Sequence, residues 1–407
     1  MHRRTLVVGI CLAVCVMVSI SFLGWRGVIS VAQGGDTRPT YVIQEYVSYQ
    51  FNVLKNPTGL TVLPYNYDTQ QGLAIFIADT GNHVIRRFDT ASAQFQIVAG
   101  TGQAGYVNGN LAPSYYVPLG QPGPPYAQFD APSGVTGTST ACYDNVNNVG
   151  YDCFDLVVSD TLNHVLRRVQ LNTAPNCQLT DYPCQVTTLA GNGSDGLVDG
   201  PPSSASFSDP TGITMSTNGW YVADAGSDTV RAVDWFGNVS TYAGNGTSGY
   251  VNGYRTSAQF TASSKITKDA AGNMYVADIG NNMIRKIDTA GNVATCAGAG
   301  PSGHVDAQGA GACFFRPTAV VYNSADNMLY VADSHNNCIR RIDMSGNVTT
   351  YAGTGTAGLV DGARAQAQFS TPTDLVIVNG FMYVSDSTNN AIRRIDMASG
   401  IVSTYIT

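Results

Sequence analysis

From about residue 54 onwards, the chain alternates short apolar runs with turns rich in glycine, asparagine and aspartate. Runs of this length predict β-strands joined by tight turns. One phrase of mixed apolar and polar positions recurs six times, which predicts a repeat architecture with one copy per unit. The copies are IADTGNHVIRRFD (77–89), VSDTLNHVLRRVQ (158–170), VADAGSDTVRAVD (222–234), VADIGNNMIRKID (276–288), VADSHNNCIRRID (331–343) and VSDSTNNAIRRID (384–396).

The sequence around each phrase repeats as well. Upstream stands an apolar run such as 210–215, downstream one such as 239–244, and a glycine-rich linker such as 244–253 precedes the next unit. Each unit therefore offers four short strands, the content of one propeller blade. We predict an all-β, six-bladed β-propeller over residues 54–407. The expected blades cover about 54–105, 127–196, 205–249, 258–303, 312–358 and 367–407.

The phrase resembles the NHL repeat family, because 82–84 and 163–165 read Asn-His-Val, close to the Asn-His-Leu triplet that names it. The resemblance covers about residues 54–407 and implies the same six-bladed fold. Departures are few: Ser227, Ala232, Gln170 and Ser263 each replace the residue expected at their position. Two positions match in all six copies: Asp79, Asp160, Asp224, Asp278, Asp333 and Asp386, and seven residues later Arg86, Arg167, Arg231, Arg285, Arg340 and Arg393.

We interpret these two repeated positions as structural. An aspartate at a strand end accepts hydrogen bonds from the following turn, and an arginine seven residues later returns on the adjacent strand within reach of the carboxylate. Most cationic side chains therefore serve the scaffold. With a net charge of −7 and a pI near 5.1, the chain also lacks the basic surface that nucleic acid requires. We predict no nucleic-acid partner.

The first residues differ from the rest of the chain. Arg3 and Arg4 precede an apolar run from Thr5 to Trp25, which is typical of a membrane-targeting element over residues 1–32. Cleavage after 30–32 as a signal peptide and retention as a signal-anchor helix both fit. Either alternative places the body on the extracytoplasmic side, secreted or membrane-anchored. Residues 33–53 form an extension in which 41–53 is expected to be a strand that packs between the first and last blades.

Cysteine and sequon positions fit an oxidising compartment. Cys142 with Cys153, and Cys177 with Cys184, are candidate disulfides that would close short loops, although crossed pairings of the four stay open. A third pair, Cys296 with Cys313, is a further candidate and leaves Cys338 as a free thiol. Candidate glycosylation sites are Asn192, Asn238, Asn245 and Asn347.

Few residues suggest catalysis. His83 and His164 occupy equivalent positions, and histidines that converge on the axis would resemble the metal site of amidating lyases, which are six-bladed relatives. Calcium-dependent lactonases of the gluconolactonase type are a second comparison, but their carboxylates include Glu, and Glu45 is the only one here. We predict no cofactor and no catalytic or metal residue. A metal-dependent hydrolase or lyase with calcium or zinc in the central channel is the alternative function.

The early blades are asymmetric. Blade two carries insertions at about 137–153 and 171–185, between its first and second and its third and fourth strands, so both emerge on one face. Blade one has a Tyr-Asn-Tyr-Asp turn at 65–68 on the same face. We predict a non-enzymatic, monomeric binding or scaffold propeller that contacts a protein or glycan there. The candidate contact residues are Tyr65, Tyr67, Tyr143, Tyr151 and Tyr182.

Overall fold

The computed structural model describes residues 53–65, 72–110, 126–144, 149–172, 184–298 and 300–407, together with four short strands before residue 43. The chain divides into two compact units, Met1–Val53 and Leu54–Thr407. In the first unit, β1 (Ile20–Phe22) pairs with β2 (Trp25–Gly27), and β3 (Ser30–Val31) pairs with β4 (Tyr41–Val42). The predicted targeting segment otherwise lies outside the described residues.

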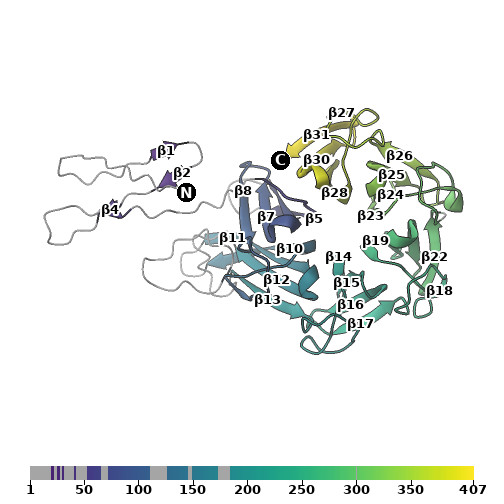
Figure 1. The fold of residues 1–407 in the computed structure, drawn as a ribbon, viewed down its shortest axis with the longest axis horizontal. Helices are drawn as coiled ribbons and strands as arrows, with labels where there is room; N and C mark the ends of the chain where they lie inside the picture. Colours follow the sequence, from purple (N-terminus) through teal and green to yellow (C-terminus); the bar gives the residue numbers. More distant parts are fainter. Residues whose placement is uncertain are drawn as a thin grey trace, which may run out of the picture. The chain divides into compact units, whose positions relative to one another are not determined.

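The second unit is a ring of six antiparallel sheets, which confirms the predicted six-bladed β-propeller (Figure 1). Each blade is a meander of four consecutive strands, with the first at the central channel and the fourth at the periphery. Blade one is β5 (Gly59–Tyr65), β6 (Gly72–Asp79), β7 (Val84–Asp89), β8 (Phe95–Ala99); blade two is β10 (Pro132–Asp144), β11 (Val149–Asp160), β12 (Val165–Asn172), β13 (Gln185–Ala190); blade three is β14 (Pro210–Ser216), β15 (Gly219–Asp224), β16 (Thr229–Asp234), β17 (Val239–Ala243). Blade four is β19 (Ser263–Lys268), β20 (Met274–Asp278), β21 (Met283–Ile287), β22 (Asn292–Ala297); blade five is β23 (Pro317–Asn323), β24 (Met328–Asp333), β25 (Cys338–Ile342), β26 (Val348–Ala352); blade six is β28 (Pro372–Val378), β29 (Phe381–Asp386), β30 (Ala391–Asp396), β31 (Ile401–Ile406).

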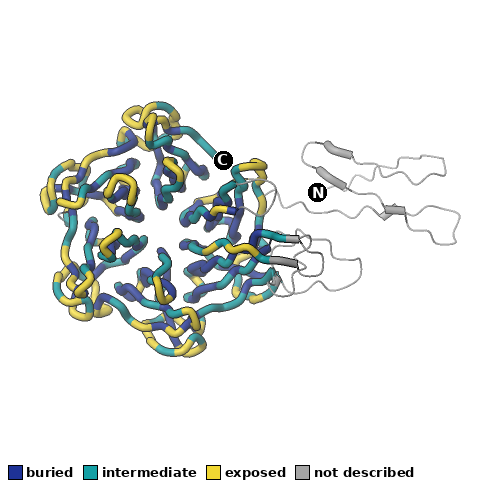
Figure 2. Tube along the Cα trace, turned by 180° about the vertical axis from the view of Figure 1, so that it is seen from behind, coloured by how far each residue is buried: buried dark blue, intermediate teal, exposed yellow. Residues whose placement is uncertain are grey.

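The core lies between neighbouring blades. Near-continuous apolar runs such as 74–78 and 329–332 bury both faces of the second strands, and the main apolar clusters join residues of two adjacent sheets. Figure 2 shows this burial as an inner ring, with exposed turns at the outside. The linker ahead of a blade adds one fully buried aromatic ring, and removing such a ring costs about 3–5 kcal/mol. These rings belong to Phe129, Phe207, Phe260, Phe314 and Phe369.

Linkers also extend the sheets at the periphery. β9 (Gly109–Asn110) pairs with β13, β18 (Gly253–Tyr254) with β22, and β27 (Gly362–Ala363) with β31. Single bridges do the same in blades three and five, where Gly200 pairs with Val239 and Gln308 with Asn347. Among the described residues, blade one has no such addition to β8.

Residues immediately before β5 close the ring. The backbone N–H of Asn56 donates to Oδ1 of Asn390 at 2.8 Å, and the carbonyl oxygen of Pro57 accepts from the hydroxyls of Ser387 and Thr373. Leu54 packs in the apolar cluster that joins blades one and six. The expected closing strand at 41–53 lies outside the described residues, apart from the 41–42 pairing in the first unit and Val53.

The first insertion of blade two is a longer hairpin rather than an irregular loop. β10 and β11 remain paired as far as Asp144 and Val149, whereas the corresponding hairpin of blade three ends at Ser216 and Gly219. A disulfide between Cys142 and Cys153 joins its two strands, as predicted. Most of the second insertion, 173–183, lies outside the described residues.

Two cysteine predictions have different outcomes. Cys184 is disulfide-bonded, while its expected partner Cys177 lies outside the described residues. The proposed bridge between Cys296 and Cys313 is wrong, because both thiols are free. Cys296 packs among apolar residues between blades four and five, and burial raises the pKa of its thiol to about 11. Cys338 is a buried free thiol, as predicted.

Candidate functional site

The repeated aspartate and arginine form a buried network at the end of each second strand. In blade five, Oδ1 of Asp333 accepts the backbone N–H of Phe315 at 2.8 Å. Its Oδ2 accepts from Nδ2 of Asn336 and from Nη1 of Arg340, both at 2.8 Å. Burial raises the pKa of Asp333, and the same cause raises the pKa of four equivalent carboxyl groups. These are Asp160, Asp224, Asp278 and Asp386, with the pKa of Asp224 raised to about 6.

The arginine continues the network to the preceding linker. Nη2 of Arg340 donates to the carbonyl oxygen of Val305 at 2.8 Å and to Oδ1 of Asp306 at 2.6 Å. Its guanidinium also stacks on Phe314, 5.2 Å from the ring centroid. One arginine thus ties two strands of its own blade to the linker that enters it. With this geometry, the aspartate and the arginine of blade five hold two strands and the preceding linker together.

The histidine position has an equally structural geometry. Nδ1 of His83 accepts the backbone N–H of Ala131 at 3.1 Å, and Nδ1 of His164 accepts that of Asp209 at 3.3 Å. Both donors stand at the start of the next blade. The histidines have left-handed backbones, φ 55° and 54°, which Asn, Asp and His tolerate best. The equivalent side chains Asp228, Asn282, Asn337 and Asn390 accept in the same way.

Each histidine is therefore directed at the next blade by a hydrogen bond, and its Nδ1 is occupied. Among the described residues, no group of three or more His, Cys, Asp or Glu side chains could hold a metal ion. His83 and His164, the two histidines considered for a channel metal site, thus each accept a hydrogen bond from the next blade.

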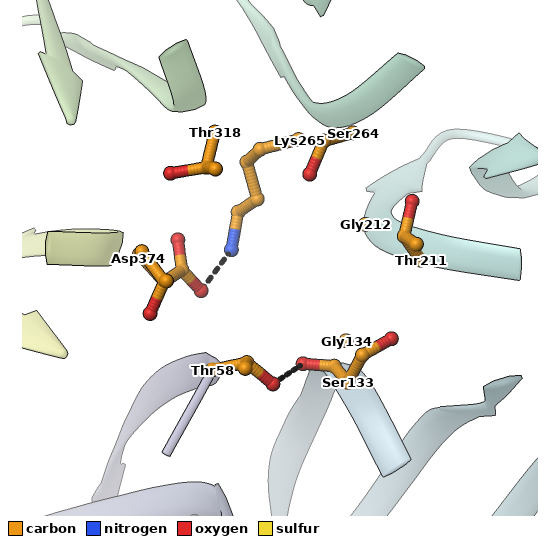
Figure 3. Close-up of a pocket in the computed structure, with 10 residues that line it drawn as sticks. Thr58, Ser133, Gly134, Thr211, Gly212, Ser264, Lys265, Thr318 and Asp374 are labelled. Carbon is orange, nitrogen blue, oxygen red and sulfur yellow. Dashed lines mark hydrogen bonds and ion pairs between the residues drawn. The ribbon is translucent and has the colours of Figure 1, made fainter. Parts of the chain in front are cut away.

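The central channel contains a cavity of about 150 Å³ (Figure 3). A hydroxyl-bearing residue from the start of every innermost strand lines it: Thr58, Ser133, Thr211, Ser264, Thr318 and Thr373. Several of these hydroxyls donate to a carbonyl oxygen of the next blade, as Thr58 does to Ser133 at 3.1 Å and Thr373 to Pro57 at 3.1 Å.

Two charged side chains cross this cavity. Nζ of Lys265 on β19 lies 2.8 Å from Oδ2 of Asp374 on β28, so the ion pair joins blades four and six across the channel (Figure 3). Oδ2 of Asp374 also accepts the backbone N–H of Leu60 at 2.8 Å. The Asp374 side chain is 3% exposed and that of Lys265 is 16% exposed. Lysine and carboxylate neutralise each other, and the ten lining residues include no histidine, cysteine or glutamate.

This ion pair was not predicted from the sequence, although a signal was present. The residue after the hydroxyl-bearing one is Gly59, Gly134 and Gly212 in blades one to three, but Lys265, Ala319 and Asp374 in blades four to six. A Cβ at Gly59 or Gly134 would lie 2.0 or 2.1 Å from a carbonyl oxygen of the next blade. Glycine therefore permits neighbouring blades to approach each other closely in blades one to three. The side chains of Lys265 and Asp374 enter the channel from the other half of the ring.

The predicted contact residues do not behave alike. Tyr65 is 5% exposed, and its hydroxyl donates to Oδ1 of Asp89 at 2.6 Å, so it is a core residue and not a surface contact. Burial raises the pKa of Tyr65. Tyr151 packs against the Cys142–Cys153 disulfide. The side chains of Tyr67, Tyr143 and Tyr182 lie outside the described residues.

An aromatic turn on the same face was not predicted. Successive strands of a blade are antiparallel, so the turns after the first and third strands emerge together. In blade three, the turn after the third strand carries Trp235, 48% exposed, and Phe236, 83% exposed. Oδ1 of Asp234 accepts the backbone N–H of Phe236 at 2.9 Å, and Trp235 packs edge-on against Trp220. The turn is thus held in one shape with Phe236 facing solvent. The corresponding turns of blades four and five carry Thr289 and Met344.

All four sequon asparagines are exposed. Two of them, Asn238 and Asn347, donate from Nδ2 to a turn aspartate, at 2.8 and 2.7 Å. Their use as glycosylation sites stays a prediction.

No protein-family model matches the chain. It is 27% identical over 368 residues to SUPPRESSOR OF QUENCHING 1, a chloroplastic protein of Arabidopsis thaliana, covering 88% of this chain and 27% of that protein. It is 26% identical over 354 residues to human NHL repeat-containing protein 2, covering 83% of this chain and 40% of that protein. The chain thus spans less than half the length of these relatives.

Solved structures show the same fold. An auxiliary nutrient binding protein from Bacteroides thetaiotaomicron superimposes with a TM-score of 0.55 at 16% identity, covering 86% of this chain and 70% of that one. Its counterpart from Bacteroides ovatus gives a TM-score of 0.50 at 17% identity, with 93% and 83% covered. The repeat phrase, the six blades and the similarity to NHL repeat-containing protein 2 together support an NHL-repeat β-propeller.

Within the part of the chain that the structure describes, no helix is both long enough and apolar enough to cross a membrane.

Proposed function

We propose that this protein is a non-enzymatic binding or scaffold propeller. Its contact surface is the face where blade two extends its hairpin and blade three presents Trp235 and Phe236; we call this the hairpin face. The observation that carries the proposal is the hairpin itself. Blade two continues pairing to Asp144 and Val149, and a disulfide holds its two strands at Cys142 and Cys153.

A rigid projection beside an exposed aromatic turn suits partner recognition. Aromatic rings supply large contact area at low entropic cost, and binding energy concentrates in a few such residues. Phe236 is exposed although it stands in a well-ordered turn, so it stabilises little in the free protein. Two solved propellers of this fold are nutrient-binding proteins, so the fold is compatible with a binding role.

The proposed compartment is extracytoplasmic, secreted or membrane-anchored through the N-terminal segment. The cross-strand disulfide and the bonded Cys184 support it, because disulfides persist in oxidising compartments. The proposed ligand is a protein or a glycan, bound by the monomer.

The test compares partner binding by four forms of the protein. A partner is captured from the source cells by cross-linking, purified, and titrated against the wild type, the variant Phe236→Ser, and a variant in which Asn-Gly replaces residues 141–152 and serine replaces Cys153. This deletion keeps Phe154, which is buried against Phe76. Asn327→Gly, in a turn on the same face of blade five with φ 56°, is the matched control.

The proposal predicts that Phe236→Ser weakens binding at least about tenfold, the scale of a contact worth 1.4 kcal/mol or more, while Asn327→Gly leaves it unchanged. Equal affinity of all the forms would show that the hairpin face is not the contact surface.

A further inference from the structure

Blades two to six share a contact that blade one does not have. In each of the five, Nη2 of the repeated arginine donates to a valine carbonyl of the preceding linker at 2.7–3.2 Å. The same Nη2 donates to the side-chain oxygen of the next residue, Asn or Asp, at 2.6–3.0 Å. The linker also pairs with the outermost strand of the blade. An internal peptide thus occupies the outer edge of five blades.

Blade one has the arginine without the peptide. Arg86 forms its ion pair with Asp79 through Nε, and no described residue accepts a hydrogen bond from its buried Nη2. Arg86 is 2% exposed, so this terminal nitrogen has lost water without gaining a described partner, whereas in blades two to six the nitrogen without a partner is Nε. No described strand pairs with the outer edge of β8 either. A buried charged donor and a strand edge with no described partner therefore occur in the same blade.

The aromatic partner of this arginine also differs. Lys55 donates its backbone N–H to Asp79 as Ser208 does to Asp224, so Leu54 stands where the linker of blade three has Phe207. The Arg86 guanidinium instead stacks on Phe95 of β8 itself, 4.9 Å from the ring centroid. Blade one thus supplies from its own outer strand the ring that a linker supplies elsewhere.

The internal linkers define the chemistry of the missing peptide. Each has a valine, then Asn or Asp, then a small residue: Val107-Asn-Gly, Val198-Asp-Gly, Val251-Asn-Gly, Val305-Asp-Ala and Val360-Asp-Gly. Residues 33–53 contain no such triplet: Val42 is followed by Ile43 and Val47 by Ser48, and Phe51-Asn52 is followed by Val53 instead of a small residue. The chain therefore does not carry this sequence ahead of blade one, which favours a partner as its source.

We propose that the outer edge of blade one, formed by β8 and Arg86, binds an extended strand of a partner polypeptide with an apolar residue followed by Asp or Asn and Gly. The peptide adds a strand to the sheet, a recurring recognition mode, and its carbonyl and side-chain oxygens accept from Nη2 of Arg86. The site is separate from the hairpin face, so either proposal can fail alone.

Ile97 of β8 limits the affinity for the peptide, because it stands where blade three has Thr241. In blade three, the linker Asp199 also accepts the backbone N–H and the hydroxyl of Thr241. Thr241 stands opposite Arg231, and the residue opposite Arg86 is Ile97. Arg86 and main-chain groups alone therefore recognise the peptide side chain, so Asn and Asp peptides bind similarly and weakly.

The test uses a synthetic peptide with the sequence of residues 195–204, DGLVDGPPSS, capped at both ends, and a second peptide with alanine in place of Asp199. Each is titrated into the full-length protein labelled at isoleucine methyl groups. The Ile97 signal reports the edge, and Ile342 of blade five is the internal control. The variants are Arg86→Lys, which keeps the charge and loses Nη2, and Arg168→Lys as its matched control.

The proposal predicts a saturable shift of the Ile97 signal with the first peptide and about tenfold weaker binding after Arg86→Lys, the scale of one charge-assisted hydrogen bond. Absence of a saturable shift at millimolar peptide, or an equal response to the alanine peptide, would overturn it. A further variant carries glycine at residues 46–48. Binding to this variant alone would show that the chain occupies its own edge, and the partner assignment would be wrong.

Discussion

The repeated aspartate and arginine show how one pair of residues builds a blade. Asp333 collects three donors, and Arg340 reaches two strands and the linker through both terminal nitrogens. Such a buried pair is costly to break, because removing one partner leaves a desolvated charge. The pair was predictable from the sequence because it recurs six times at a fixed spacing.

Arg340→Lys is expected to lower the free energy of unfolding by about 2–4 kcal/mol, because lysine cannot reach Asp333, the linker carbonyl and Asp306 together. Arg86→Lys should cost less, since Arg86 has no linker partner. Urea unfolding measures both, with Arg341→Lys as the control. Equal costs for positions 340 and 86 would contradict the role given to the linker.

The turn aspartates should make the stability of the fold depend on pH in the acid range. Hydrogen bonds from Asn347 and Ser345 lower the pKa of Asp343 to about 2. Because the pKa of this carboxyl group is lower in the folded than in the unfolded protein, the group stabilises the fold at pH values above the unfolded pKa of about 3.9. This stabilisation is lost as the pH falls towards 2. Asp343 is partly exposed, so solvent screening keeps the effect below about 1 kcal/mol. Unfolding followed between pH 5 and 2 should fall less steeply for Asp343→Asn than for the wild type; parallel curves would contradict the assignment.

At the level of the element, the insertions illustrate what a sequence leaves open. Their position between strands followed from the repeat, but nothing in 137–153 distinguished a loop from an extended hairpin, because this pairing continues beyond the last β12 partner of β11, at Cys153. Tyr65 was misplaced for a similar reason. Its ring stands at a strand end, where its hydroxyl reaches Asp89 on a strand that the sequence does not show to be near.

The disulfide should stabilise the hairpin locally. Replacing Cys142 and Cys153 with serine removes a cross-link that closes a short loop, worth at most about 3 kcal/mol. Hydrogen exchange should rise between residues 139 and 153 and stay unchanged in blades three to six. Cys313→Ser, which removes a free thiol, is the control. Unchanged protection of the hairpin would mean that pairing alone fixes it.

At the level of the whole molecule, hydrogen bonds between blades one and six close the ring, and no strand is exchanged between its ends among the described residues. Asn390 accepts from Asn56 across the last interface as Asn337 accepts from Thr371 across the preceding one. Repetition made the six blades predictable. The Lys265–Asp374 ion pair was not predictable, because both residues depart from the glycine of blades one to three and become neighbours only once the ring closes.

Asn390→Ala and Asn337→Ala should therefore cost similar amounts, about 1 kcal/mol each, because both remove one interblade hydrogen bond. Thermal or urea unfolding of the two variants provides the comparison, with exposed Asn379→Ala as a control for the loss of an asparagine. A lower free energy of unfolding for Asn337→Ala, with no change for Asn390→Ala, would indicate that blades one and six separate in solution.

The claim that the hairpin face binds a partner is tested most directly by hydroxyl-radical footprinting of the full-length protein, free and with its captured partner. The account predicts protection of Trp235, Phe236 and Tyr151, with no change at Tyr250 and Phe315, which are exposed on other blades. Protection of Tyr250 or Phe315, with Phe236 still fully reactive, would contradict it.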